Sequence, residues 1–184
     1  MDMQIYGGYM NVHKLMTVAL AVLVFAGVAA IGAENMAPDF SLKDTTGKTV
    51  TLSTLRGKVV FVDFWASWCP PCRMSIPKVK QLQEKFKDSK VVILGINVEN
   101  DAGIAANFAR KERINYAILT GNEKVERAYR VSGIPAFLVI DTEGRIVKRY
   151  DGYFPGMEKE WDKIITEALQ EQKKPATAKP IKTK

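Results

Sequence analysis

Residues 59–73 of this 184-residue chain read Val-Val-Phe-Val-Asp-Phe-Trp-Ala-Ser-Trp-Cys-Pro-Pro-Cys-Arg. The apolar run Val59–Trp65 is rich in β-branched residues, which is typical of a central strand covered on both faces. It leads into a Cys-x-x-Cys turn formed by Cys69 and Cys72, the two cysteines of the chain, and then into a predicted helix. At a helix N-terminus, free N–H groups and the positive end of the dipole favour a thiolate, so this pair is expected to be reactive.

The composition is that of an ordinary globular chain, with 47% hydrophobic and 26% charged residues. The formal net charge is +7, but five Lys and one Glu within residues 171–184 carry more than half of it. Nucleic-acid recognition calls for basic charge on the folded body, so we expect no nucleic acid among the partners. The stretch 171–184 is too polar to pack, and we expect it to be a disordered basic tail.

Residues 15–33 form an uncharged apolar segment between Lys14 and Glu34, and small residues occupy its end. This pattern predicts that residues 1–33 are a secretory signal peptide or an uncleaved membrane anchor. The lysine on the leading side indicates that the following domain, residues 34–170, is exported to the periplasm or to the outer face of the cytoplasmic membrane. Contact with the membrane is expected only through the N-terminal segment, if it stays uncleaved.

The hydrophobic periodicity of the remaining chain predicts alternating strands and helices. Two short strands precede the central strand, helices and strands then alternate, and a β-hairpin and a helix close the domain. This order predicts an α/β fold with a mixed sheet. The expected elements are a hairpin at 40–43 and 48–52, a helical turn at 53–57, strands at 59–65, 90–98, 116–119, 136–140 and 145–150, and helices at 73–86, 101–113, 123–130 and 156–170.

The stretch Phe64–Cys72, together with Gly133–Pro135 further along the chain, resembles the thioredoxin superfamily. The opening Ala37–Phe40, the extra hairpin and an insert around residues 100–121 resemble its exported, TlpA/ResA-like branch. The likeness covers about Ala37 to Leu169. It implies a thioredoxin-like three-layer α/β sandwich, with a mixed β-sheet, an N-terminal β-hairpin and a central insert.

Three residues are expected to carry the chemistry. Cys69, which leads the helix and should be partly exposed, attacks a substrate disulfide, and Cys72 then resolves the mixed disulfide. The resemblance implies that Asp63, on the central strand, is buried behind the second cysteine and relays its proton. Burial of this carboxyl group would raise its pKa.

A second set of residues is expected to bind the substrate. The resemblance implies a cis peptide bond before Pro135 and a loop that presents backbone groups to a bound peptide and keeps metals off the thiols. Prolines between the cysteines fix the turn and remove N–H donors that would otherwise point at the sulfur. The expected substrate-binding residues are Trp68, Pro70, Pro71, Ile134 and Pro135.

The sequence departs from the family pattern at two positions near Asp63. Gly95 stands where thioredoxin has a lysine facing the acid, and Ser75 stands where many ResA-like proteins have a glutamate. Glu99, at the end of the next strand, is an alternative acid for the same role.

Neither a metal nor a haem is expected at the cysteine pair. A structural zinc site needs four ligands, and the one histidine, His13, lies in the leader. A c-type haem site needs a histidine directly after the second cysteine, where this chain has Arg73. The expected redox group is therefore the Cys69–Cys72 disulfide itself, with no cofactor.

These features predict an exported thiol–disulfide oxidoreductase that reduces disulfides of envelope proteins, apocytochrome c among them. A membrane thiol-electron carrier is the expected reductant.

A disulfide-forming oxidase is the alternative, because both directions use the same residues and export permits oxidation. A thiol peroxidase is a weaker alternative, since Ala66 stands where peroxiredoxins have threonine. A client-binding chaperone with a vestigial cysteine pair is the non-enzymatic alternative. A Sco-type copper protein would need a Cys-x-x-x-Cys motif and a distant histidine.

Overall fold

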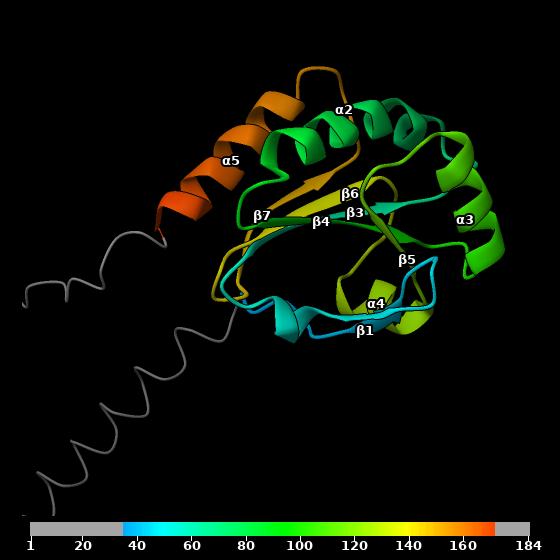
Figure 1. The fold of residues 1–184 in the computed structure, drawn as a ribbon, viewed down its shortest axis with the longest axis horizontal. Coiled ribbons are helices and arrows are strands. Elements are labelled where there is room, and N and C mark those ends of the chain that lie inside the picture. The colour runs from blue at the N-terminus through cyan, green and yellow to red at the C-terminus, as the bar shows by residue number, and fades with distance from the viewer. Residues whose placement is uncertain (1–34, 172–184) are drawn as a thin grey trace, which may run out of the picture. The chain divides into compact units, whose positions relative to one another are not determined.

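A computed structural model describes residues 35–171 of the chain (Figure 1). The predicted signal peptide or anchor at 1–33 and the predicted tail, apart from Glu171, lie outside these residues. Glu171 is the last residue of the C-terminal helix, which therefore extends one residue beyond the predicted domain boundary. Within the described part of the chain, no helix has both the length and the apolar character needed to cross a membrane.

A five-stranded mixed sheet with the strand order β5-β4-β3-β6-β7 forms the core. The central strand β3 pairs in parallel with β4 and antiparallel with β6, while the outer strands β5 and β7 pair with β4 and β6. The prediction of a mixed sheet is confirmed. The strands are β3 (Val59–Trp65), β4 (Val91–Asn97), β5 (Ala117–Thr120), β6 (Ala136–Ile140) and β7 (Ile146–Asp151).

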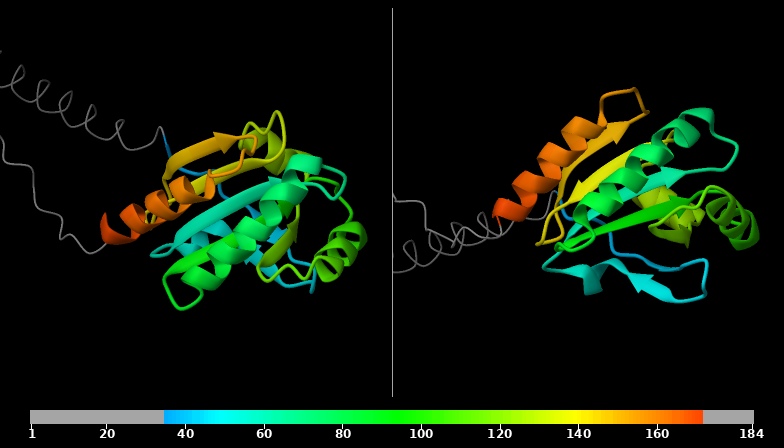
Figure 2. Two further views of the ribbon diagram at one scale, coloured as in Figure 1. Left: turned by 90° about the horizontal axis from the view of Figure 1, so that it is seen from above. Right: turned by 45° about the horizontal axis from the view of Figure 1, so that its top comes forward.

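Helices cover both faces of this sheet (Figures 1 and 2). Helices α2 and α5 lie over one face, while α4 and a small N-terminal sheet cover the other, which confirms the predicted three-layer sandwich and N-terminal hairpin. The predicted insert corresponds to α3 and the edge strand β5. The remaining elements are β1 (Ser41–Lys43), β2 (Thr49–Thr51), the 3-10 helix η1 (Leu52–Leu55), α2 (Pro70–Phe86), α3 (Ala102–Lys111), α4 (Glu123–Ala128) and α5 (Glu158–Glu171).

Strand β3 is buried along its whole length and divides the core in two. Phe61 and Trp65 pack beneath α2 and α5, whereas Val60 and Phe64 pack against the layer formed by β1, η1 and α4. Because side chains alternate along a strand, Asp63 lies on the same face as Phe61 and Trp65. The pattern therefore places one carboxyl group in the apolar layer beneath α2.

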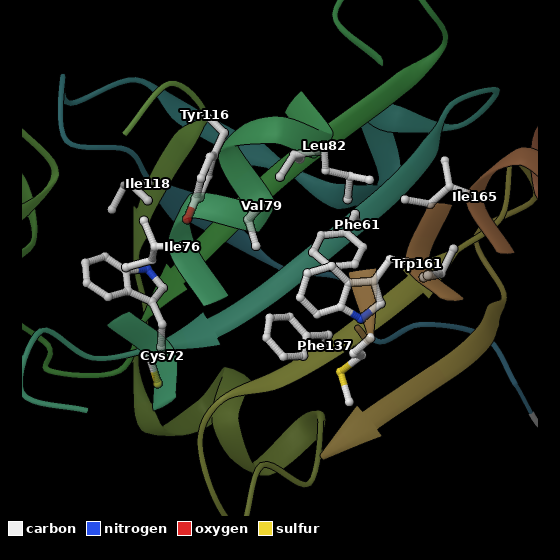
Figure 3. Close-up of a cluster of buried hydrophobic side chains, with 14 of the residues drawn as sticks. Phe61, Cys72, Ile76, Val79, Leu82, Tyr116, Ile118, Phe137, Trp161 and Ile165 are labelled. Carbon is white, nitrogen blue, oxygen red and sulfur yellow. The ribbon is translucent and has the colours of Figure 1, made fainter. Parts of the chain in front are cut away.

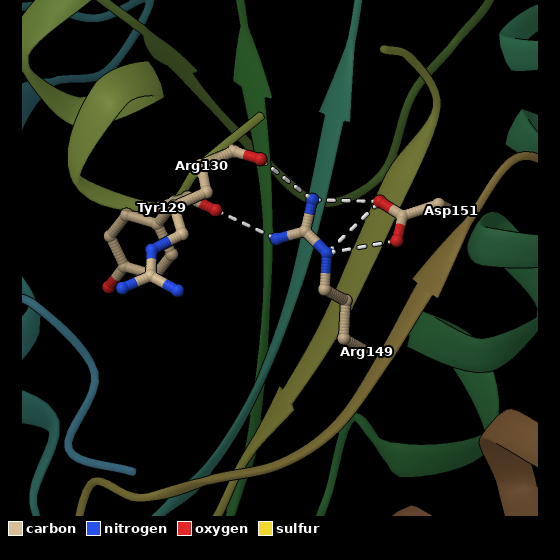
Figure 4. A network of polar contacts seen from close by, with 4 residues as sticks. All are labelled: Tyr129, Arg130, Arg149 and Asp151. Carbon is tan, nitrogen blue, oxygen red and sulfur yellow. Dashed lines mark hydrogen bonds and ion pairs between the residues drawn. The ribbon is translucent and has the colours of Figure 1, made fainter. Parts of the chain in front are cut away.

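Arg149 of β7 forms hydrogen bonds that link the end of α4 to the sheet (Figure 4). Its guanidinium donates to the backbone oxygens of Tyr129 at 2.7 Å and Arg130 at 3.2 Å, and to the carboxylate of Asp151 at 2.7–3.0 Å. Arg130 has a φ of 51°, a left-handed conformation in which the helix cannot continue. Arg149 thus holds the start of the segment that leads to Pro135.

Candidate active site

The Cys-x-x-Cys turn lies between β3 and α2, and its two cysteines form a disulfide. Cys69 is the N-cap residue of α2, and the Cys72 N–H donates to the Cys69 sulfur at 3.2 Å. Pro70 and Pro71 occupy the first two helical positions, where proline suits the backbone but supplies no N–H. The helix consequently begins three residues earlier than predicted, and Cys72 provides its first N–H to the sulfur.

The two cysteines are more buried than the sequence indicated. Cys72 is fully buried, as expected, but Cys69 retains only 2% of its surface, so the prediction that it is partly exposed is wrong for the disulfide form. The loop around Ile134 covers Cys69, because the Ile134 carbonyl oxygen lies 3.8 Å from the Cys69 sulfur. Trp68, directly before Cys69, is 67% exposed and forms the open side of the turn.

The loop opposite the disulfide contains a cis peptide bond between Ile134 and Pro135, which confirms the prediction. The Pro135 carbonyl oxygen accepts a 2.7 Å hydrogen bond from the Gly152 N–H, so the loop is tied to the residue that follows β7. Phe154, two residues further on, is a largely exposed aromatic residue that the sequence analysis did not single out. It lies in the segment between β7 and α5.

The five residues predicted to bind substrate lie in the turn and in the loop opposite it. Trp68 and Pro70 adjoin Cys69 in the chain and Pro71 follows. The Ile134 carbonyl oxygen lies 3.8 Å from the Cys69 sulfur, and the cis bond joins Ile134 to Pro135. Their exposure falls from the turn toward the loop. Trp68 and Pro70 are exposed, Pro71 and Ile134 are half-buried, and Pro135 is buried.

Asp63 is fully buried, and burial raises its pKa to about 8. Neither of its carboxyl oxygens has a hydrogen-bond partner among residues 35–171. Asp63 pairs in register with Gly95 of β4. The position that faces the acid from this strand is therefore glycine, as predicted, and not the lysine of thioredoxin. A carboxyl group in these surroundings stays largely protonated at neutral pH, unlike an ordinary surface carboxylate.

The other two polar residues considered near Asp63 have structural partners. Ser75 is fully buried, and its hydroxyl donates to the Cys72 carbonyl oxygen at 2.9 Å. Glu99 accepts hydrogen bonds from the Ser67 N–H at 2.6 Å, from the Ser67 hydroxyl at 2.8 Å and from the Asn97 amide at 2.8 Å. Glu99 therefore positions the turn before the cysteines, a role that the sequence analysis missed. The part of the chain described here shows no group of three His, Cys, Asp or Glu side chains that could hold a metal ion.

A disulfide at the start of a helix, facing a cis-proline loop at the end of a mixed sheet, defines a thioredoxin-like thiol–disulfide oxidoreductase. Comparison with known proteins agrees, because the chain belongs to the Redoxin family, whose sequence pattern matches residues 32–165. The chain is 38% identical to the thiol-disulfide oxidoreductase ResA of Bacillus subtilis over 130 residues, which cover 70% of this chain and 73% of ResA. It is 31% identical to ResA of Geobacillus thermodenitrificans over 143 residues, 75% of this chain and 82% of that protein.

Solved structures show the same relationship. A crystal structure from Chlorobium tepidum, described as a candidate thiol:disulfide interchange protein DsbE, aligns with a TM-score of 0.69 and 34% identity. The alignment covers 73% of this chain and 96% of that protein. The predicted resemblance to the ResA-like branch and the predicted enzyme class are thus confirmed.

Proposed function

We propose that this protein is an exported reductase of protein disulfides. The observation that carries the proposal is the Cys69–Cys72 disulfide at the N-terminus of α2. Both cysteines are buried in this form, but Cys69 adjoins the exposed Trp68 and the Ile134 carbonyl oxygen, whereas Cys72 lies inside the helix. Cys69 is therefore the sulfur that a substrate can approach. The Cys72 sulfur suits intramolecular release, because no second substrate can reach it.

In the reduced protein, the Cys69 thiolate attacks one sulfur of a substrate disulfide, and the other substrate sulfur leaves as a thiolate that takes up a proton. The Cys72 thiolate then attacks the Cys69 sulfur. The bond between Cys69 and the substrate breaks, and the second substrate thiolate leaves. Two electrons have passed to the substrate, and the protein ends as the Cys69–Cys72 disulfide that the structure shows.

Asp63 is proposed to accept the Cys72 proton before the second step. Its carboxylate takes the thiol proton and becomes the neutral acid, which its buried surroundings favour. The thiolate left on Cys72 is then the nucleophile that resolves the mixed disulfide. Turnover of an Asp63→Asn variant tests this role, because an amide cannot accept the proton. Unchanged resolution at neutral pH would contradict it.

The client is proposed to bind along the surface formed by Trp68, Pro70, Pro71, Ile134 and Pro135. The exposed Trp68 ring offers apolar contact, and the half-buried Ile134 offers a backbone carbonyl beside the sulfur. Candidate clients are envelope proteins with disulfides, including the haem-binding cysteines of apocytochrome c. A membrane thiol-electron carrier is the proposed reductant. The disulfide is itself the redox group, so we propose that no cofactor takes part.

The reduction potential of the disulfide decides the direction of electron flow. Equilibration of the protein with dithiothreitol or glutathione buffers measures it. We expect a reducing value near or below the roughly −270 mV of thioredoxin. A value close to the roughly −120 mV of strong oxidants would instead make the protein a disulfide-forming oxidase. If no redox couple were found, the reductase proposal would be overturned, and a client-binding role would remain.

Export depends on the N-terminal segment, and a separate experiment tests it. A reporter enzyme that is active only outside the cytoplasm is fused to the C-terminus of the full chain. Reporter activity is expected with the intact chain and is expected to disappear when residues 15–33 are deleted. Activity that persists without the segment would contradict its proposed role as signal or anchor.

A further inference from the structure

Several polar atoms are buried without a hydrogen-bond partner on the face of the sheet that α2 covers. Among the described residues, these include both carboxyl oxygens of Asp63, Nε1 of Trp65 and the hydroxyl of Tyr116. Trp65 and Tyr116 belong to the apolar cluster beneath α2, and the alternation of β3 puts Asp63 on the same side. A buried polar group without a hydrogen-bond partner costs free energy of folding. Two donors and a carboxyl group buried together on one face therefore need an explanation.

Gly95 brings these groups together. It is the register partner of Asp63 on the neighbouring strand. A Cβ atom at Gly95 would lie 2.7 Å from Ile118 Cδ1, 3.0 Å from Trp65 Nε1 and 3.0 Å from Tyr116 Cε2. The Trp65 and Tyr116 rings, together with Ile118, therefore take the space that a side chain at this position would fill. The edge of the Tyr116 ring therefore lies over the residue directly beside Asp63.

The Tyr116 side chain points into the buried layer and not toward solvent. Figure 3 shows its hydroxyl oxygen directed into the cluster of buried side chains that also contains Ile76 and Val79. Burial, and secondarily the charge of Asp63, raise the pKa of Tyr116 well above its ordinary value. The hydroxyl accordingly remains a neutral donor at any pH at which the protein works, and it senses the charge on Asp63.

Two polar groups of α2 lie on this face: Cys72 is held in the disulfide, and the Ser75 hydroxyl donates to the Cys72 carbonyl oxygen. Strands β4 and β6 present Gly95 and Phe137 at the register positions beside Asp63.

Trp65 Nε1 is a second unpartnered donor, but it lies on the same strand as Asp63, whereas Tyr116 approaches across β4. Burial is the one cause that shifts the pKa of Asp63, so no cation lowers it. A carboxylate formed here needs a neutral hydrogen-bond donor instead.

We propose that Tyr116 is a positioning residue for Asp63. The Tyr116 hydroxyl and the Asp63 carboxyl group have no hydrogen-bond partner in the structure described here, and the hydroxyl donates to Asp63 when this carboxyl group ionises. The proposal rests on the proposed role of Asp63 as proton acceptor for Cys72. Tyr116 touches neither substrate nor sulfur in this scheme. It sets the fraction of Asp63 that is ionised, and hence ready to take the thiol proton.

Titration of the Asp63 carboxyl carbon by NMR in the full-length oxidised protein tests the proposal. The Tyr116→Phe variant removes only the hydroxyl, so ionised Asp63 loses its donor and the midpoint should rise by about one pH unit, a tenfold change in proton affinity. Tyr129→Phe is the matched control. The Tyr129 hydroxyl is also a buried donor, but it bonds the Pro38 carbonyl oxygen at 2.7 Å on the other face of the sheet. An Asp63 midpoint that is equal in wild type and Tyr116→Phe would overturn the proposal.

A reciprocal measurement needs no change at Tyr116. The Cζ resonance of Tyr116 in the wild type should move with the same midpoint as the Asp63 carboxyl, and it should stay constant over that range in Asp63→Asn. A resonance that ignores the Asp63 titration would also overturn the proposal.

The two proposals fail in different ways. Should Asp63→Asn resolve mixed disulfides at the wild-type rate, Asp63 is not the proton acceptor, yet the shifted midpoint in Tyr116→Phe would still establish the pairing. If both roles hold, Tyr116→Phe resolves mixed disulfides about tenfold more slowly than wild type at neutral pH, and the rate recovers as the pH rises.

Discussion

Asp63 is a fully buried carboxyl group whose pKa is raised to about 8 by burial, against 3.8 for an ordinary aspartate. Below about pH 4 it is protonated in both the folded and the unfolded chain, so the stability does not change with pH on its account. Between about 4 and 8 the unfolded chain has lost this proton while the folded protein keeps it. The folded state binds more protons in this window, so the contribution of Asp63 to stability falls as the pH rises.

Replacement of Asp63 by Asn should remove this pH dependence. The variant is expected to gain stability relative to wild type between about pH 5 and pH 8, by roughly 1.4 kcal/mol per pH unit and several kcal/mol in all. Urea unfolding of the oxidised proteins across this range measures the difference. A constant offset between the two proteins would show that Asp63 ionises normally in the folded state.

At the level of secondary-structure elements, the N-terminus of α2 controls the Cys69 sulfur. An N-cap side chain accepts hydrogen bonds from the second and third helical residues, which here are Pro71 and Cys72. The proline supplies no N–H, so the sulfur receives one donor where two positions are available. Pro71 therefore limits the stabilisation of a Cys69 thiolate.

The Pro71→Ala variant restores the second donor and is expected to lower the pKa of the Cys69 thiol. The gain should be of the order of a hydrogen bond to a charged group, about 1.5–3 kcal/mol at most. Thiolate absorbance of the reduced protein, followed against pH, measures it. Pro70→Ala is the matched control, because the first helical N–H does not point at the cap, and it should shift the titration much less. Equal titrations in wild type and Pro71→Ala would contradict this account.

Arg149 links β7 to the residues that follow α4 (Figure 4). Its guanidinium donates to two backbone oxygens that no other residue could serve in the same geometry, since the planar fork reaches both at once. Arg149→Ala should lower the free energy of unfolding by about 1–3 kcal/mol. Arg127→Ala removes an exposed ion pair with Glu123 and should change it by less than about 0.5 kcal/mol. Chemical denaturation distinguishes the two, and a similar loss in both would refute the role of Arg149.

For the whole molecule, two tryptophans have opposite surroundings, one in the core and one on the proposed client surface. Trp161 of α5 is fully buried and packs on Phe61 and Phe137, with ring centroids 5.2 Å and 4.5 Å away, so it joins the helical layer to the sheet. Trp68 is exposed and makes the open side of the active site. The fold therefore separates the tryptophan that joins the layers from the tryptophan proposed to contact a client.

Alanine at each position should separate these roles. Trp161→Ala is expected to lower the free energy of unfolding by about 3–5 kcal/mol because it leaves a large cavity. Trp68→Ala is expected to change it by less than about 0.5 kcal/mol. It should nevertheless lower kcat/KM for a disulfide-bonded protein client about tenfold, through lost apolar contact. Full activity in Trp68→Ala would remove this residue from the proposed client surface.

Local patterns predicted most of the secondary structure. The β-branched run of β3, the helical spacing after the cysteines and the turn signals in the hairpins each report a preference that acts over a few residues. The predicted and observed ends of the elements differ by a few residues where the capping residues, and not the hydrophobic spacing, decide where a helix begins. The start of α2 is an example, because the Pro70–Pro71 pair extends the helix to the cysteine itself. The cis bond before Pro135 came from family resemblance, since local chemistry alone favours trans.

Contacts between residues far apart in the chain were not predictable in this way. Glu99 bonds Ser67 across 32 residues, and Arg149 bonds Tyr129 across 20. Nothing near either residue in the sequence indicates its partner. The burial of Cys69 was missed for the same reason, because the loop that covers it lies 65 residues away.

The sequence alone was sufficient to identify the redox pair, the order of strands and helices and the family, because these depend on residue types at short, regular spacing. The tertiary structure decided the surroundings of the buried carboxyl group. The pairing of β3 with β4 places Gly95 beside Asp63, and the absence of a side chain at Gly95 leaves room for the Tyr116 and Trp65 rings. Parallel register is set by how whole layers pack and not by any local pattern, so these neighbours of the predicted buried acid became visible only in the folded chain.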